Sequence, residues 1–168
     1  MMFNKNIDFK NFKIKRNTKY IKEKLELLIK ENNQVIKSLS KKYKYSFDKK
    51  KLNKYKKFSN YRIIGMGGSS LGAQAIYDFL KHKIKKNFLF INNLQNNNKL
   101  IKQKKYTNLI ISKSGNTIET IVNANVLIKK KDTNILVTEN KKSYLYLLAE
   151  KLKADIVHHN NFIGGRYS

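Results

Sequence analysis

Two short turns rich in glycine and serine hold the side chains of this 168-residue chain that are best suited to bind an anion. They lie in residues 63–72, IIGMGGSSLG, and in residues 110–117, IISKSGNT. In each of them an apolar run enters the turn and a helical pattern follows it. Glycine lets backbone N–H groups turn toward a ligand, and the N-terminus of a helix favours negative charge. Together the two turns predict one phosphorylated ligand that is held from two sides.

The second turn brings three hydroxyl groups to the start of a helix. Ser112, Ser114 and Thr117 are each able to donate a hydrogen bond to a phosphate oxygen. The alternative is ordinary helix capping by Ser114 or Asn116. Lys113 either adds positive charge to the site or points to solvent. The first turn, taken alone, is also compatible with a purely structural tight turn.

A third candidate lies at residues 162–168, FIGGRYS. Its two glycines allow the chain to pass close to a ligand. Arg166 follows them and suits a sugar phosphate or a developing oxyanion, although a structural salt bridge is the alternative. His158 and His159 precede this segment. No third ligand at metal-binding spacing accompanies the two histidines, so we expect structural roles for them and no metal site.

Two familiar nucleotide motifs do not fit the first turn. Ser70 stands where the third glycine of G-x-G-x-x-G belongs, and residues 91–93 end the next strand without a carboxylate for a ribose. A P-loop needs Lys and Ser or Thr after its last glycine, whereas Ala73 and Gln74 follow Gly72. What remains is a site built from backbone amides and hydroxyl groups.

The elements that must position these turns alternate between strand and helix from residue 61 onward. The expected strands are 61–65, 88–92, 108–112, 134–138 and 155–158. The expected helices are 70–83, 95–104, 116–130 and 142–152. Such alternation predicts an α/β fold with a five-stranded parallel sheet and helices on both faces. Both serine turns then open at one edge of the sheet, because ligands of parallel sheets bind outside the carboxyl ends of the strands.

The preceding part of the chain has a helical pattern. Apolar residues at helical spacing predict one helix from about Asn17 to Ser40, capped by Asn17 or Thr18. Residues 41–60 form a connector rich in Lys and Tyr, with room for a second short helix. We therefore expect a short helical N-terminal region before the α/β domain.

The bulk composition narrows the class of protein. The net charge is +26, but it comes from 34 lysines and only three arginines, so we interpret it as a solvated basic surface and not as a nucleic-acid site. Cysteine is absent, which excludes disulfides and Cys-ligated metals. No apolar run reaches the roughly 20 residues of a membrane span, and no secretory signal opens the sequence. We expect a cytoplasmic protein that does not bind membranes.

The three motifs, in their order and at their spacing, resemble the signatures of the glucose-6-phosphate isomerase family. They are residues 64–72, residues 112–120, SKSGNTIET, and residues 164–168, GGRYS. The resemblance covers about residues 61–168. It implies sugar isomerase (SIS) domains, of which the first holds the substrate phosphate. On this basis we divide the chain into a helical N-terminal region, 1–58, and an SIS-type domain, 59–168.

The resemblance also implies roles for individual residues. Arg166 is expected to stabilise the enediolate intermediate, and Glu119 to support the phosphate loop. No metal or organic cofactor is implied. The residues expected to bind the sugar and its phosphate are Gly68, Ser69, Ser112, Lys113, Ser114 and Thr117.

The sequence departs from the family after Ser168. The catalytic base, the ring-opening histidine and a late lysine of that family belong to a second SIS domain, which this sequence lacks. We therefore expect a truncated or split isomerase chain that binds a hexose 6-phosphate and needs a second SIS half or partner chain, with a homodimer as the complete enzyme. The alternative is an SIS-domain sensor that binds sugar phosphates without catalysis.

Overall fold

The computed structural model of the protein describes residues 18–31, 33–94 and 105–164. The chain divides into two compact units, Met1–Tyr43 and Lys44–Ser168. The first unit contains the helices α1 (Lys19–Lys30) and α2 (Gln34–Ser38). The single helix predicted for residues 17–40 is therefore wrong, because Asn33 interrupts it. The Asn33 side chain accepts a hydrogen bond from the Val35 N–H at 2.8 Å and so begins a new helix.

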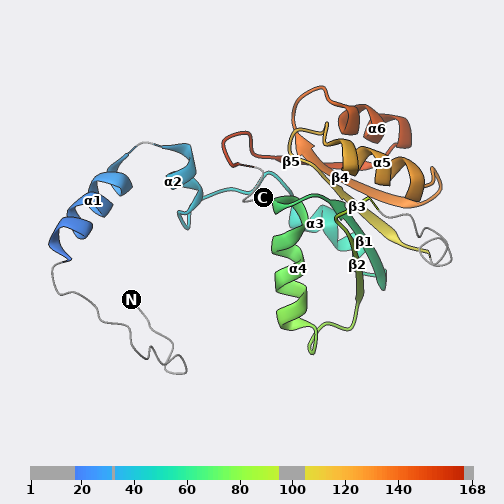
Figure 1. Cartoon of the computed structure of the whole chain (residues 1–168), viewed down its shortest axis with the longest axis horizontal. Helices are drawn as coiled ribbons and strands as arrows, with labels where there is room; N and C mark the ends of the chain where they lie inside the picture. Colours follow the sequence, from blue (N-terminus) through green and yellow to red (C-terminus); the bar gives the residue numbers. More distant parts are fainter. Residues whose placement is uncertain (1–17, 32, 95–104, 165–168) are drawn as a thin grey trace. The chain divides into compact units, whose positions relative to one another are not determined.

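The second unit is an α/β domain (Figure 1). Its strands are β1 (Asn60–Gly65), β2 (Asn87–Ile91), β3 (Thr107–Ile111), β4 (Thr133–Glu139) and β5 (Asp155–His159). Its helices are α3 (Lys49–Leu52), the 3₁₀ helix η1 (Asn53–Tyr55), α4 (Gly68–Leu80), α5 (Ile118–Leu127) and α6 (Tyr144–Leu152). The helix predicted at 95–104 lies outside the described residues.

All five strands run parallel, in the order β2-β1-β3-β4-β5. This confirms the predicted α/β fold class with a five-stranded parallel sheet. The chain moves from β1 outward to β2 on one side, and from β3 to β4 and β5 on the other. The strand order therefore reverses between β1 and β3, which is the position where open parallel sheets bind their ligands.

The core is a row of aliphatic side chains that crosses the sheet. Hydrogen-bonded register places Ile91, Ile64, Ile110, Leu136 and Ile156 side by side on one face. The first four are almost completely buried, and each such side chain contributes roughly 1.5–3 kcal/mol through burial. They pack against apolar side chains of α5 and α6, namely Ala124, Leu127, Leu145 and Ala149.

Helix α4 covers the other face. Its Tyr77 ring lies 5.1 Å from the ring of Phe88 and 5.9 Å from that of Phe90. These β2 side chains alternate with Ile91 and so point away from the aliphatic row. The prediction of helices on both faces is thus confirmed. Within the described residues, no helix is long and apolar enough to cross a membrane.

One of the three arginines is structural. Arg62 is buried in β1 and donates a hydrogen bond to the Leu127 carbonyl oxygen at 2.9 Å, at the C-terminus of α5. Its guanidinium lies 4.5 Å from the centre of the Tyr106 ring. Burial lowers the pKa of Arg62. The negative end of the helix dipole favours a cation at this position, so Arg62 stabilises the packing of α5 against the sheet.

Candidate functional site

A cavity of about 550 Å³ opens at the carboxyl ends of β1, β3 and β4. It lies at the reversal of strand order between β1 and β3. Both serine turns contribute to it, as the two-turn hypothesis requires. The lining residues are Met66, Gly68, Ser69, Lys113, Ser114, Thr117 and Glu139. Five of the six residues predicted to bind the sugar or its phosphate therefore line one cavity.

The sixth predicted residue, Ser112, lies beneath the lining. It is 2% exposed, directly after β3. Its hydroxyl shares a hydrogen bond of 2.9 Å with the hydroxyl of Thr117 and lies 3.5 Å from that of Ser114. The three hydroxyl groups thus form one cluster, in which Ser112 orients the two that reach the cavity.

Thr117 is the N-cap residue of α5, and its side chain makes no capping hydrogen bond to that helix. The predicted alternative, capping by Ser114 or Asn116, is therefore wrong for α5. The Asn116 side chain instead accepts a hydrogen bond of 3.0 Å from the Tyr144 N–H, at the start of α6. The first N–H groups of α5 have no intrahelical acceptor, and they remain suited to an anion.

Gly115 has a geometric reason to be glycine. Its φ is +69°, and an added Cβ would lie 2.1 Å from Ser143 Oγ and 2.8 Å from Thr138 Oγ1. Its carbonyl also accepts the Leu145 N–H at 3.0 Å. The second serine turn, residues 112–117, therefore packs closely against the start of α6, and this contact fixes the backbone that carries its hydroxyl groups.

Gly65 brings the two turns together. An added Cβ there would lie 3.0 Å from the Ile111 carbonyl oxygen and 3.2 Å from Ser69 Cβ. The end of β1 can therefore approach the end of β3 closely. Helix α4 begins directly afterwards at Gly68, so its N-terminus joins that of α5 beside the cavity.

The two charged side chains that line the cavity form an ion pair. Lys113 Nζ lies 3.2 Å from Glu139 Oε1, and the two side chains are 22% and 20% exposed. Lys113 also donates a hydrogen bond of 3.0 Å to the Asn161 carbonyl oxygen. Lys113 is thus held inside the site and does not extend into solvent. Sequence reasoning missed Glu139, although its position at the end of the strand next to β3 could have indicated it.

The other candidates that the structure describes lie outside this cavity. Glu119 is partly exposed in the first turn of α5 and is not among the lining residues. His158 and His159 belong to β5; the His158 carbonyl accepts a hydrogen bond from Ser46, and His159 Nδ1 lies 2.9 Å from the Asn160 carbonyl oxygen. Arg166 lies outside the described residues. Across the described ranges, no cluster of three or more His, Cys, Asp or Glu side chains is placed to hold a metal.

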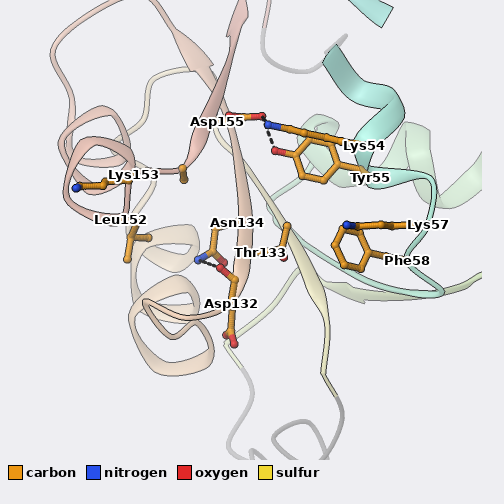
Figure 2. Close-up of a pocket in the computed structure, with 11 residues that line it drawn as sticks. Lys54, Tyr55, Lys57, Phe58, Asp132, Thr133, Asn134, Leu152, Lys153 and Asp155 are labelled. Carbon is orange, nitrogen blue, oxygen red and sulfur yellow. Dashed lines mark hydrogen bonds and ion pairs between the residues drawn. The ribbon is translucent and has the colours of Figure 1, made fainter. Parts of the chain in front are cut away.

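A second cavity, of about 270 Å³, lies at the amino ends of β4 and β5 (Figure 2). Here the Asp155 carboxylate accepts a hydrogen bond from the Tyr55 hydroxyl and pairs with Lys54, both at 2.5 Å. The hydrogen bonds from Lys54 and Tyr55 lower the pKa of Asp155. Burial, and then the bond to Asp155, raise the pKa of Tyr55 to about 12. These polar groups satisfy one another, so we interpret this cavity as structural.

The second unit belongs to the class of open parallel α/β domains, with a cavity at the reversal of strand order. The profile of one family, described as phosphoglucose isomerase, matches residues 16–168. The chain therefore belongs to the phosphoglucose isomerase family, as its motifs indicated.

Curated relatives support the same family. The chain is 35% identical over 131 residues to glucose-6-phosphate isomerase of Borreliella afzelii, and the match covers 67% of the chain and 25% of that protein. It is 36% identical over 132 residues to glucose-6-phosphate isomerase of Methanocaldococcus jannaschii, over 70% of the chain and 32% of that protein. The chain thus spans about a quarter to a third of the length of these relatives.

Solved structures support the fold alone. A hypothetical protein from Thermus thermophilus superposes with a TM-score of 0.60 at 21% identity, over 71% of this chain and 33% of that one. Tagatose-6-phosphate ketose/aldose isomerase from Escherichia coli superposes with a TM-score of 0.54 at 15% identity, over 68% of this chain and 35% of that one.

Proposed function

We propose that this chain supplies the phosphate-binding part of a cytoplasmic glucose-6-phosphate isomerase, with residues 59–168 as its SIS-type domain. The observation that carries the proposal is the single cavity shared by both serine turns. It presents the hydroxyl groups of Ser69, Ser114 and Thr117 beside two helix N-termini. Hydroxyl and N–H donors at a helix start are the groups that bind a phosphate dianion.

In this proposal the 6-phosphate of the hexose lies between Gly68 and Ser69 on one side and residues 112–117 on the other. Ser112 orients the hydroxyl groups of Ser114 and Thr117 through its hydrogen bonds. Arg166 stabilises the enediolate, as the family resemblance implies. The base, the ring-opening histidine and the late lysine come from a second SIS domain, supplied by further polypeptide or by a partner chain in a dimeric enzyme.

The first test is binding of glucose 6-phosphate to the 168-residue chain, measured by calorimetry. We expect saturable binding by the chain at one site per molecule, and displacement of the sugar phosphate by inorganic phosphate. Absence of binding at millimolar concentrations of the sugar phosphate would contradict the proposal.

The second test is catalysis in a coupled dehydrogenase assay. The chain alone is expected to interconvert glucose 6-phosphate and fructose 6-phosphate no faster than background, because stabilisation of the enediolate without proton abstraction leaves the main step uncatalysed. Addition of a polypeptide with the second SIS domain should restore turnover, and Arg166→Ala should then remove most of it. Turnover by the chain alone, lost in Glu119→Gln, would place the base in this half.

The second candidate function is a sugar-phosphate sensor without catalysis. The observation that favours it is that Glu139, the carboxylate among the residues that line the cavity, is already paired with Lys113 at 3.2 Å. Tight binding of a hexose phosphate together with no turnover after the second domain is added would support the sensor over the enzyme.

A further inference from the structure

We propose that Glu139 determines specificity in the cavity, by accepting hydrogen bonds from the hydroxyl groups of a bound sugar phosphate. It would thereby favour a sugar phosphate over a phosphate ester that carries no hydroxyl group. This inference rests on the proposed function, since it concerns the same cavity, and it assigns a role to a residue that none of the three sequence motifs contains.

The backbone around Glu139 is held firmly. Glu139 is the last residue of β4, and its N–H donates a hydrogen bond of 3.0 Å to the Lys113 carbonyl oxygen. The Thr138 hydroxyl donates to the same carbonyl at 3.2 Å. The end of β4 is thus fixed to the phosphate loop, and the Glu139 side chain enters the cavity from a rigid element.

One carboxylate oxygen of Glu139 contacts Lys113, and the other is available to accept a hydrogen bond from a ligand. Oε1 lies 3.2 Å from Lys113 Nζ, which also donates to Asn161. Oε2 has no hydrogen-bond partner among residues 18–31, 33–94 and 105–164. An ionised carboxylate only accepts hydrogen bonds, so it attracts hydroxyl donors and repels the anionic group of a ligand.

The cavity therefore has two chemically different sides. Hydroxyl groups from Ser69, Ser114 and Thr117, with the starts of α4 and α5, form a donor side. Glu139 supplies an acceptor on the side of β4. A ligand that is anionic at one end and carries hydroxyl groups at the other matches both sides at once, and a sugar phosphate has this form.

The experiment compares two esters with the same phosphate group, glucose 6-phosphate and methyl phosphate, by NMR titration of the full chain. The measured quantity is the ratio of their affinities. Glu139→Gln should lower this ratio by roughly fivefold, because a hydrogen bond to a charged acceptor is about twice as strong as one to a neutral acceptor. Methyl phosphate itself should bind more tightly, since the variant removes a like charge.

Two further variants make the result specific. Glu150→Gln removes the same charge from an exposed position on α6, and it should leave the ratio unchanged. Glu139→Asp keeps the counter-charge of Lys113 but withdraws the carboxylate by one methylene group. It should weaken glucose 6-phosphate binding and leave methyl phosphate binding at the wild-type level.

The outcomes separate the inference from the proposed function. Equal changes in both affinities in Glu139→Gln, or a ratio unchanged in both Glu139 variants, would overturn the role of Glu139 alone. A wild-type chain that binds neither ester would overturn the proposed function, and the inference with it.

Discussion

Both ends of the sheet carry polar side chains, but only at the amino ends are these side chains paired mainly with one another. At the amino ends of β4 and β5, the Asp155 carboxylate receives both the Tyr55 hydroxyl and the Lys54 ammonium group (Figure 2). At the carboxyl ends of β1, β3 and β4, hydroxyl groups and helix N–H groups face a larger cavity. Polar groups that satisfy one another stabilise the fold, whereas groups left facing a cavity are available to a ligand.

The difference follows from the geometry of parallel strands. Helices α4 and α5 begin next to the carboxyl ends of β1 and β3, and their first N–H groups lack acceptors within the helix. At the amino ends, the 3₁₀ helix η1 instead contributes the side chains of Lys54 and Tyr55, which contact Asp155 of β5. Substitutions of the side chains that face the cavity at the carboxyl ends are therefore predicted to change ligand affinity. Substitutions in the Asp155 cluster at the amino ends are predicted to change stability.

The largest effect on stability is expected for Gly115→Ala, in the turn that follows the carboxyl end of β3. The residue has φ of +69°, and the new methyl group would approach Ser143 Oγ to 2.1 Å. We expect a loss of roughly 3 kcal/mol or more in the free energy of unfolding, measured by urea denaturation. Gly72→Ala is the control, because its Cβ meets nothing within 4 Å and alanine favours the helix. Equal stability of the two variants would contradict the tight contact.

The next effect concerns the hydroxyl cluster. Ser114→Ala and Thr117→Ala should each weaken binding of a sugar phosphate by roughly 1–3 kcal/mol, because each hydroxyl would donate to a charged oxygen. Calorimetric titration measures the loss, and Thr117→Ser, which keeps the hydroxyl group, is the matched control. Unchanged affinity in the double alanine variant would make the second turn purely structural.

The substitution Asp155→Asn tests whether the polar cluster at the amino ends of β4 and β5 stabilises the fold. It should lower the free energy of unfolding by about 1–2 kcal/mol at neutral pH, through the hydrogen bond from Tyr55, without changing ligand affinity. Asp78→Asn, at an exposed position of α4, is the matched control. A loss of sugar-phosphate affinity in Asp155→Asn would show that the two ends are coupled.

The pH dependence of this variant has a defined sign. The folded-state pKa of Asp155 is lowered, so its contribution is complete above the unfolded value near 4 and is lost as the pH falls through the folded pKa. The difference in stability between wild type and Asp155→Asn should therefore shrink in acid. A difference that persists at the lowest pH would contradict the assignment.

The last effect is expected only at alkaline pH. The pKa of Tyr55 is raised to about 12, mainly by burial, so the folded state retains this proton. The contribution of Tyr55 to stability is complete below its unfolded pKa near 10 and is lost as the pH rises toward 12. Wild type should thus lose more stability than Tyr55→Phe across this interval. Burial also raises the pKa of Tyr61, so phenolate absorbance should show a late-titrating component that is smaller by one tyrosine in the variant.

Much of the fold follows from local sequence. Strands such as β1 and β3 begin and end within one residue of their predicted bounds, because apolar runs end at glycine and serine turns. The N-terminal helical region was predicted less well. Its apolar residues keep one helical spacing on both sides of Asn33, so the spacing does not indicate the break between α1 and α2. A side chain that caps a helix competes with continuation of that helix, and hydrophobic spacing does not report this competition.

The parallel α/β class, the two serine turns and the family to which the chain belongs could all be predicted from the sequence. These depend on spacing along the chain and on turn chemistry, which are local properties. The structure was needed to show that the Ser112 and Thr117 hydroxyl groups share a hydrogen bond and that the Asn116 side chain accepts the Tyr144 N–H at the start of α6. It was also needed to show that Glu139 pairs with Lys113 in the cavity. Each of these contacts joins elements separated in the sequence or turns a side chain away from its local partner, and the register of β3 against β4 brings the last pair together.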